Sequence, residues 1–234
     1  MSEIDLNCDL GEGPAEEPIY PLVTSANIAC GGHAGDERTM AAAVREALRH
    51  RVAIGAHPSF PDRDRFGREA LPMPADEIAE AVGSQVLALA RIALRLGAAL
   101  RHVKPHGALY GEAMRDAAVA GAIARGVSTD ASGLVLVGLA GSPALPLWRA
   151  LGFDVAREGF ADRVYEPDGS LRSRRLPGAL ILDPEQAAAQ AVRLAADGRV
   201  DTISVHSDTP GAVSILAAVR EALTRAGFSL RPLR

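Results

Sequence analysis

Short apolar segments typical of strands alternate about seven times with longer segments whose apolar residues recur at helical spacing. One short segment, residues 134–139, reads LVLVGL, which favours a strand buried on both faces of a parallel sheet. Such alternation is typical of an α/β fold with a mostly parallel sheet. The expected strands are 4–9, 26–30, 52–56, 100–104, 134–139, 153–158, 202–206 and a short 229–230, and the expected helices are 37–50, 76–96, 114–127, 143–151, 184–196 and 211–226.

Two architectures fit this alternation, a doubly wound open sheet and a closed barrel. The sequence contains neither a GxGxxG nor a GxxxxGKS or GxxxxGKT fingerprint, and its only lysine is followed by proline. A nucleotide-binding doubly wound sheet is therefore disfavoured. We find no internal repeat or linker that would divide the chain. The sequence thus predicts one (β/α) barrel domain over residues 1–234, with seven strands.

The composition argues against several classes of protein. The formal net charge is −4 at pH 7, which gives no basic surface for nucleic acid. No uncharged apolar run approaches the roughly 18 residues of a membrane-spanning helix. The acidic first residues lack the apolar core of a signal peptide. Two cysteines, Cys8 and Cys30, are too few for a disulfide scaffold, so we expect a cytoplasmic protein.

Uncommon polar residues gather where the predicted strands end. Four of the six histidines and both asparagines of the chain lie at or just after the carboxyl end of a predicted strand. In a β/α barrel these ends converge on one mouth, where active sites are built. The residues placed there are Asn7, Asp9, Asn27, His33, Asp36, His57, Lys104, His106, Glu158, Asp162, Arg163, His206 and Asp208.

Lys104 is unusual because the other 24 of the 25 basic residues are arginines. An ammonium group is compact, and burial can tune its pKa. His106 follows two residues later, so on an extended strand it faces the same way as Lys104. Pro105 between them prevents the segment from continuing as a central strand. We interpret Lys104 as a contact for an anion or an oxyanion, and the structural alternative is a surface lysine beside a histidine.

Several single residues have a plain structural interpretation. Asp9 could be a turn residue, and Asp36 could have no role beyond capping the helix that follows it. His50 ends a predicted helix, where a cation suits the helix dipole. His102 begins a strand, and we treat it as structural too. Cys30 lies near the mouth but lacks any neighbour in sequence that would lower its pKa, so a small buried hydrophobe is the preferred interpretation.

A long polar loop is expected at residues 57–74, which exceeds the length of an ordinary connector. It carries Arg63, Arg65 and Arg68. These arginines could bind an anion, cover the mouth, dock a partner or simply be solvated, and the sequence leaves all four interpretations open.

The mouth fits two classes of chemistry. In metal-assisted hydrolysis, Asp9 and two of the histidines would hold a divalent ion. The histidines concerned are His33, His57, His106 and His206. No HxxxH or HExxH spacing supports this locally, so no metal ligand is assigned. In metal-free hydrolysis of an amide or activated acyl group, an aspartate or histidine would activate water while Lys104 stabilises an oxyanion or a phosphate.

Seven ordered blocks that span almost the whole chain resemble the LamB/YcsF family. The blocks are DLNCDLGEG (5–13), NIACGGHAGD (27–36), GAHPSFPD (55–62), FGR (66–68), VKPHGALY (103–110), FADRVY (160–165) and VHSDTPGAV (205–213). The resemblance implies a distorted seven-stranded barrel akin to that of polysaccharide deacetylases. It also implies the ATP-dependent opening of 5-oxo-L-proline to L-glutamate, together with partner subunits B and C. Because this chain has no P-loop, ATP would be bound largely by a partner.

On this basis we assign two groups of side chains at the mouth. The expected catalytic residues are Asp9, His57, Lys104, His106 and His206. The expected substrate-binding residues are Asn7, Asn27, His33, Asp36, Tyr110, Glu158, Asp162, Arg163 and Asp208. Two other functions stay open, a metal-dependent sugar deacetylase and a non-catalytic subunit that binds the lactam. The choice of general base, the presence of a divalent metal and the oligomeric state also stay open.

Overall fold

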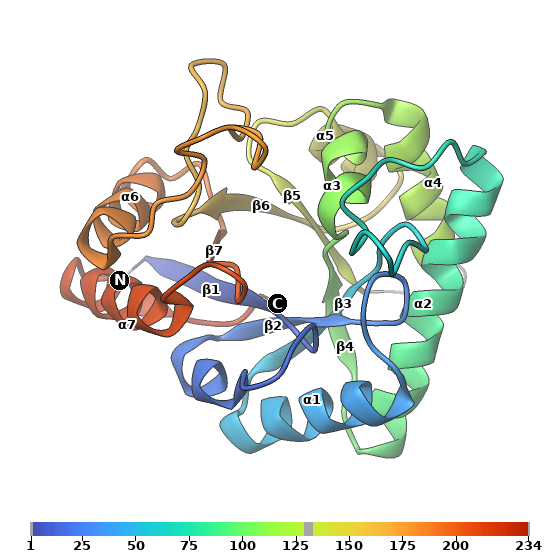
Figure 1. Cartoon of the computed structure of the whole chain (residues 1–234), viewed down its shortest axis with the longest axis horizontal. Helices are drawn as coiled ribbons and strands as arrows, with labels where there is room; N and C mark the ends of the chain where they lie inside the picture. The colour runs from blue at the N-terminus through green and yellow to red at the C-terminus, as the bar shows by residue number, and fades with distance from the viewer. Residues whose placement is uncertain (1, 129–132, 234) are drawn as a thin grey trace.

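A computed structural model describes residues 2–128 and 133–233. Seven parallel strands close into a barrel, and helices surround it (Figure 1). The strands are β1 (Glu3–Leu10), β2 (Ser25–Ala29), β3 (Ala53–His57), β4 (Leu100–Val103), β5 (Val135–Leu139), β6 (Val155–Phe160), β7 (Thr202–Ser204) and a short outer strand β8 (Ser229–Leu230). The predicted seven-stranded barrel is confirmed.

Strand β1 closes the barrel because it pairs with both β7 and β2. Its first half pairs with β7, where Asp5 lies opposite Thr202. Its second half pairs with β2, where Asp9 lies opposite Asn27. Every strand pair in the barrel is parallel, so all the carboxyl ends open on one side. Strand β8 pairs only with the first residues of β1.

Each barrel strand is followed by a helical segment, although the first of these is a short 3-10 helix. The helices are η1 (Glu17–Leu22), α1 (Glu37–His50), α2 (Ala75–Arg95), α3 (Gly107–Ala113), α4 (Ala117–Ser128), α5 (Ala144–Ala150), α6 (Pro184–Ala196) and α7 (Ala212–Arg225). Their apolar faces cover the outward side chains of the strands in one large core, and Val135, Val137 and Ala156 form a small separate cluster. Within the described residues, no helix is both long and apolar enough to cross a membrane.

The expected helix over 114–127 is wrong at its start. A separate helix, α3, already begins at Gly107 and ends at Ala113, and α4 begins at Ala117. Asp116 causes the second start, since its carboxylate accepts a hydrogen bond from the Ala118 backbone N–H at 2.7 Å. Gly107 permits the first start because its φ is +55° and a Cβ there would lie 2.5 Å from the carbonyl oxygen of Gly67.

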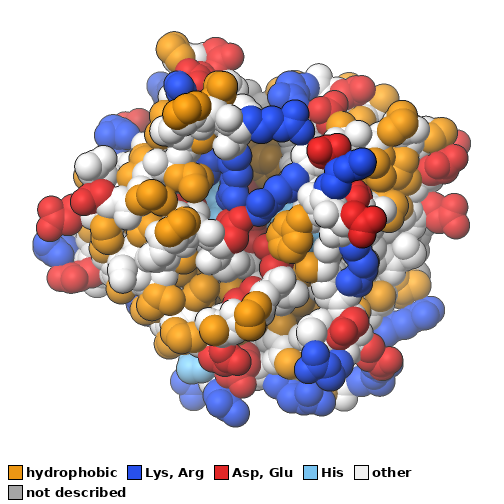
Figure 2. Space-filling model, in the orientation of Figure 1, with side chains coloured by type: hydrophobic (Ala, Val, Ile, Leu, Met, Phe, Trp, Pro, Cys, Tyr) orange, Lys and Arg blue, Asp and Glu red, His pale blue; other side chains and the backbone are white. Residues whose placement is uncertain are grey.

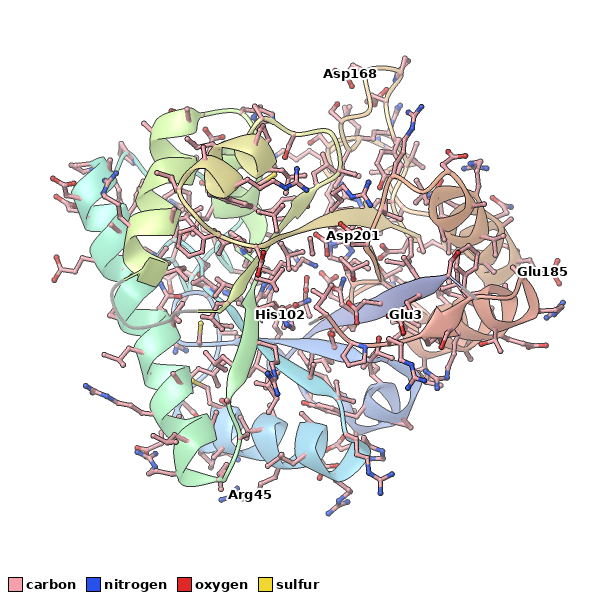
Figure 3. All side chains as sticks on the ribbon, turned by 180° about the vertical axis from the view of Figure 1, so that it is seen from behind. Glu3, Arg45, His102, Asp168, Glu185 and Asp201 are labelled. Carbon is pink, nitrogen blue, oxygen red and sulfur yellow. The ribbon has the colours of Figure 1, made fainter. Side chains whose placement is uncertain are left out.

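Between β6 and α6, residues 161–183 form a long loop that projects from the barrel, with Asp168 at its tip (Figures 1 and 3). Residues 166–169 form a turn at the tip, in which the Gly169 N–H donates to the Glu166 carbonyl at 2.9 Å. Tyr165 and Leu171 pair across this turn in an antiparallel bridge. The base of the loop therefore stays beside the barrel mouth while its tip extends away.

The interior of this barrel is polar. Along β1, alternate residues face inward, and Asp5, Asn7 and Asp9 occupy three successive levels. At the lowest level, the Asp5 carboxylate accepts hydrogen bonds from the hydroxyls of Thr24, Ser25 and Thr202 at 2.5–2.7 Å. Burial raises the pKa of Asp5 to about 6, although these hydroxyls oppose the shift. The sequence pattern predicts Asn7 at the end of the first strand, but in the structure it lies in the middle of β1.

Candidate functional site

A cavity of about 720 Å³ opens at the carboxyl ends of the strands. Eight of the predicted site residues line it, namely Asp9, His57, Lys104, His106, Tyr110, Arg163, His206 and Asp208. Six others do not line it, namely Asn7, Asn27, His33, Asp36, Glu158 and Asp162. In space-filling view, the hollow at the centre of this face is bordered by basic side chains (Figure 2).

Below the cavity, Lys104 is the centre of a network that we call the lysine network, formed with Asn7, Asp9, Glu158 and Ser204. Its ammonium lies 2.9 Å from Asp9 Oδ1, 2.8 Å from Glu158 Oε1 and 3.0 Å from Ser204 Oγ. Asn7 Oδ1 lies further away, at 3.4 Å. An ammonium has three hydrogens, and the three shorter contacts account for all of them.

Opposite charges in the lysine network stabilise one another within the barrel. Burial opposes the positive charge of Lys104, but the carboxylates of Asp9 and Glu158 outweigh it and raise the lysine pKa. Burial likewise opposes the charge on Asp9, yet His57 and Lys104 hold the pKa of its carboxyl well below the usual range. Lys104 is thus a buried counter-ion that keeps Asp9 ionised, and its three hydrogens are already used before any anion enters.

The two asparagines support this network from beneath. Asn27 Nδ2 donates to Asp9 Oδ1 and to Asn7 Oδ1, both at 2.8 Å. Asn7 Nδ2 donates to Thr202 Oγ1 at 2.7 Å. His102 donates through Nε2 to Asn27 Oδ1 at 2.7 Å, and its ring lies among the barrel strands (Figure 3). Asn7, Asn27 and His102 therefore hold the lysine network in place, which agrees with a structural role for His102.

Beside the lysine network lies a second group, which we call the histidine–glutamate cluster: Glu12, His33, His57 and His106. Glu12 Oε1 lies 2.8 Å from His33 Nε2, 3.6 Å from His57 Nε2 and 3.3 Å from His106 Nδ1. His57 Nε2 and His106 Nδ1 are 3.0 Å apart. The rings of His33 and His106 stack with their centroids separated by 3.7 Å. One donor atom from each of the four residues lies within 4.8 Å of the others, so the cluster could hold a metal ion.

Backbone carbonyls fix the orientation of two of these rings. His57 Nδ1 lies 2.7 Å from the Lys104 carbonyl oxygen, and His106 Nε2 lies 3.0 Å from the Phe66 carbonyl oxygen. A carbonyl only accepts, so each of these nitrogens carries a hydrogen. Phe66 has a φ of +56°, a conformation that non-glycine residues rarely adopt. The loop after β3 therefore holds its backbone in an uncommon conformation where it contacts His106.

Burial suppresses the positive charge on two of the three rings. It lowers the pKa of His33 to about 4, and it also lowers the pKa of His106, although Glu12 opposes both shifts. Burial opposes the charge on His57 as well, but Asp9 and Glu12 outweigh it and raise the pKa of this ring. Burial also opposes the charge on Glu12, and His106 and His33 lower its pKa overall.

Across the cavity, His206 and Asp162 form a histidine–carboxylate pair. His206 Nδ1 lies 3.0 Å from Asp162 Oδ2, which also accepts from the His206 backbone N–H at 3.1 Å and from Thr209 Oγ1 at 2.6 Å. The ring of His206 stacks on Phe160, with 5.3 Å between centroids. Asp162 thus directs the Nδ1 hydrogen, and the neutral ring keeps its Nε2 lone pair for the cavity that His206 lines.

Arginines also border the cavity. Arg163 is only 7% exposed, and its Nη2 donates to the Arg172 carbonyl at 2.7 Å. Its Nε has no partner among the residues that the structure describes. Burial lowers the pKa of Arg163 to about 10, with Arg174 adding to the shift. Arg174 and Arg68 both bind the carboxylate of Asp208, which links the loop after β3 to the loop after β6.

Several predicted residues lie outside the cavity. Asp36 is exposed and caps α1, with its carboxylate accepting from the Thr39 backbone N–H at 2.7 Å, which is the structural alternative that the sequence leaves open. Cys30 is a buried free thiol whose pKa burial raises to about 12, so it is a small buried hydrophobe. His50 ends α1 at the surface, beside Glu46.

Sequence reasoning missed Glu12, which contacts three histidines. It lies in a Gly-Glu-Gly segment that the sequence presents as a turn after β1. Its carboxylate is brought inward because Glu16 accepts from the backbone N–H groups of Gly11, Glu12 and Gly13 and holds the turn. The available signal was its place in the DLGEG block, directly after a strand end rich in polar residues.

Comparison with known proteins extends over the whole chain. The profile of the LamB/YcsF family matches residues 4–234. A protein of Chloroflexus aggregans, named as the A subunit of 5-oxoprolinase, is 49% identical over 252 aligned residues that cover all of both chains. The solved structure of a lactam utilization protein from Thermus thermophilus superimposes with a TM-score of 0.92 at 41% identity, covering 98% of this chain and 99% of that one.

A more distant solved structure bears on the fold alone. The family 4 carbohydrate esterase of Streptomyces lividans in complex with acetate superimposes with a TM-score of 0.52 at 12% identity, covering 98% of this chain and 91% of that one. The expectation of a barrel of the deacetylase type is therefore confirmed, and the likeness says nothing of the reaction.

Proposed function

Because the chain belongs to the LamB/YcsF family, we propose that it is one component of a multisubunit 5-oxoprolinase in which 5-oxo-L-proline is opened to L-glutamate. Ring opening would be coupled to ATP hydrolysis and would require partner subunits B and C. The observation that carries this proposal is that two groups line the same cavity. One is a buried arginine, Arg163, whose Nε has no partner among the described residues, and the other is His206, which the carboxylate of Asp162 orients. The names of the relatives supply the substrate, and the cavity supplies groups suited to it.

The chemistry of a five-membered lactam explains the need for ATP. An amide carbon is a poor electrophile, and transfer of the γ-phosphoryl group to the carbonyl oxygen, with release of ADP, makes it a better one. Water then adds to that carbon, and the ring C–N bond breaks with the nitrogen leaving as the amine. A second water releases phosphate from the resulting acyl phosphate. The sequence has no P-loop, so we assign most of the ATP site to the partner subunits.

Arg163 is suited to hold the negative charge of the substrate. The side chain is buried, and its Nε–H lacks a protein acceptor among the described residues. Arg163 lines the cavity, so a carboxylate or phosphoryl oxygen that enters would meet its guanidinium group, which matches the planar geometry of such anions. Lys104 would act differently, because its hydrogens already bind Asp9, Glu158 and Ser204. We therefore assign the anion contact to Arg163 and the role of buried counter-ion to Lys104.

His206 is suited to move the protons of ring opening. With Nδ1–H directed to Asp162, the neutral ring offers Nε2 to accept a proton from water and then to deliver one to the departing ring nitrogen. Stacking on Phe160 holds the ring plane in this orientation. Asp9, His57 and His106 also reach the cavity and could serve as the base in place of His206.

The test is a reconstituted assay of 5-oxo-L-proline hydrolysis with ATP, this chain and the two partner subunits. We expect glutamate only when all three proteins are present, and a loss of at least 100-fold in turnover for His206→Gln, the size typical of a lost general base. His50→Gln on the surface of α1 is the matched control and should retain full turnover. Glutamate formation that needs no addition of this chain would contradict the proposal. Release of acetate from acetylated sugars by this chain alone would instead support a deacetylase.

A further inference from the structure

We propose that the histidine–glutamate cluster is a binding site for one divalent first-row transition-metal ion, best suited to Zn²⁺. Its ligands would be Glu12 Oε1, His33 Nε2, His57 Nε2 and His106 Nδ1. The distances between these atoms that involve Glu12 run from 2.8 to 3.6 Å. Atoms bound about 2.1 Å from one metal ion are about 3.0 to 3.4 Å from each other, so the four atoms are already close to the spacing of a coordination shell.

The backbone contacts of two rings orient them as metal ligands. A ligating histidine commonly donates its other ring N–H to a carbonyl or carboxylate, which fixes both tautomer and direction. His57 does this with the Lys104 carbonyl at 2.7 Å, and His106 does it with the Phe66 carbonyl at 3.0 Å. In each neutral ring, the remaining nitrogen then carries a lone pair directed at the centre of the cluster.

When both rings are neutral and no cation is bound, these lone pairs face one another. His57 Nε2 and His106 Nδ1 lie 3.0 Å apart, and the Glu12 carboxylate lies beside both. A proton on one ring would supply a single donor for several converging acceptors, whereas a divalent ion would satisfy them all at once. His33 brings a third ring to the same point, because its Nε2 lies 2.8 Å from Glu12 Oε1.

The lysine network shows that this surplus belongs to the cluster and not to the barrel as a whole. There the ammonium of Lys104 contacts both carboxylates, Asp9 at 2.9 Å and Glu158 at 2.8 Å, so each has a cation beside it. The cluster contains a carboxylate and three imidazoles, but in the described part of the chain no lysine or arginine nitrogen is paired with Glu12. It is therefore the part of the polar interior where an added positive charge is most favourable.

The ligand types select the kind of ion. Three imidazole nitrogens with one carboxylate suit Zn²⁺ and neighbouring first-row ions, whereas Mg²⁺ and Ca²⁺ prefer ligand sets made only of oxygen. Glu12, His57 and His106 also line the cavity, so an additional coordination position would face the space where a substrate binds. The residues come from the ends of β3 and β4 and from loops after β1 and β2, which explains why no local sequence spacing revealed the site.

The test uses the intact chain alone, stripped of metal with a chelator, and titrated with Zn²⁺ in a calorimeter. We expect one equivalent of saturable binding, and weakening of at least 100-fold in each of two variants, His33→Gln and Glu12→Gln. His50→Gln is the matched control and should bind as the wild type does. Co²⁺ should bind at the same stoichiometry with visible d–d bands, and Mg²⁺ should not compete.

The outcomes separate cleanly. Circular dichroism of each variant establishes whether it is folded. Two variants are used so that the test still stands if one of them does not fold. Loss of binding in folded Glu12→Gln or His33→Gln, with binding kept in His50→Gln, supports the site. Absence of one-equivalent binding in the wild type, or equal binding by all variants, overturns it. Because no assay of hydrolysis is involved, this result is independent of whether the chain acts on 5-oxo-L-proline.

Discussion

The lysine network and the histidine–glutamate cluster lie side by side in one barrel, yet they differ in whether a lysine nitrogen contacts their carboxylates. In the lysine network, each hydrogen of the ammonium meets an acceptor within 3.0 Å, and the two carboxylates share one cation. In the cluster, the lone pairs of His57 and His106 converge with a carboxylate of Glu12.

This difference separates two uses of buried polarity. A matched network of charges specifies and holds a structure, and removing one member leaves a buried charge unpaired. A network with more acceptors than donors is energetically unfavourable without a ligand and is typical of ligand-binding sites. We infer that the lysine network mainly serves the fold and the position of Asp9, while the cluster and the opposite arginine serve ligands.

The largest expected effect is on stability, from Lys104→Met. The substitution keeps much of the length of the side chain but removes the ammonium that the buried carboxylates of Asp9 and Glu158 share. Loss of one partner from a buried ion pair costs about 3–5 kcal/mol in the free energy of unfolding. Urea denaturation followed by circular dichroism measures this loss.

Two controls sharpen this prediction. Arg95→Met removes an exposed cation that pairs with Glu37 at 2.7 Å and should change the free energy of unfolding by at most about 1 kcal/mol. Adding Glu158→Gln to Lys104→Met should recover part of the loss, because one unpaired carboxylate is then gone. A Lys104→Met protein as stable as the wild type would mean that the lysine network is not a matched network.

A smaller effect is expected from Arg163→Met, and it should fall on substrate binding. Loss of one charge-assisted contact to an anion is worth about 1.5–3 kcal/mol, which corresponds to roughly a 10- to 100-fold rise in the KM for 5-oxo-L-proline. Turnover at saturation should fall much less. Initial rates in the reconstituted assay measure both, with Arg95→Met as the matched control. A fall in turnover with KM unchanged would show that Arg163 does not hold the substrate anion.

A further effect concerns the pH dependence of stability through His102. Burial, with Lys104 adding to it, lowers the pKa of this ring from 6.5 to about 3. Below pH 6.5, His102 is protonated in the unfolded chain but stays neutral in the folded chain until the pH approaches 3. This ring therefore lowers the free energy of unfolding as the pH drops from 6.5 towards 3. Its contribution has a limiting slope of about 1.4 kcal/mol per pH unit.

The substitution His102→Gln removes this contribution while keeping a donor for Asn27. Urea denaturation between pH 6.5 and 4 should therefore show a shallower loss of stability for the variant than for the wild type. Parallel curves for the two proteins would show that the ring is not held neutral in the folded barrel.

Much of the fold follows from the sequence because local patterns determine it. The alternation of strands and helices indicated the barrel, and Asp36 was a recognisable cap for α1. The split between α3 and α4 was missed because it depends on Gly107, whose positive φ is demanded by a close approach to Gly67 from a distant loop. Contacts of that kind leave no periodic pattern in the chain.

The sequence predicted where the candidate site lies, but not how its residues divide into the lysine network and the histidine–glutamate cluster. The ends of parallel strands indicated one mouth, and eight of the predicted residues line its cavity. The sequence could not show that Lys104 would be saturated by Asp9 and Glu158, since these carboxylates come from different strands. Nor could it show that Glu12 turns inward, because a Gly-Glu-Gly segment also fits an exposed turn.

The most direct test of the division between the two networks is the turnover of Glu12→Gln in the reconstituted 5-oxoprolinase assay, read beside its free energy of unfolding measured without added metal. We predict a loss of turnover of at least 100-fold, comparable to removal of a group that acts in the transition state, with stability within about 1 kcal/mol of the wild type. Full turnover, or a loss of stability as large as that of Lys104→Met, would contradict the assignment of the histidine–glutamate cluster to function and the lysine network to structure.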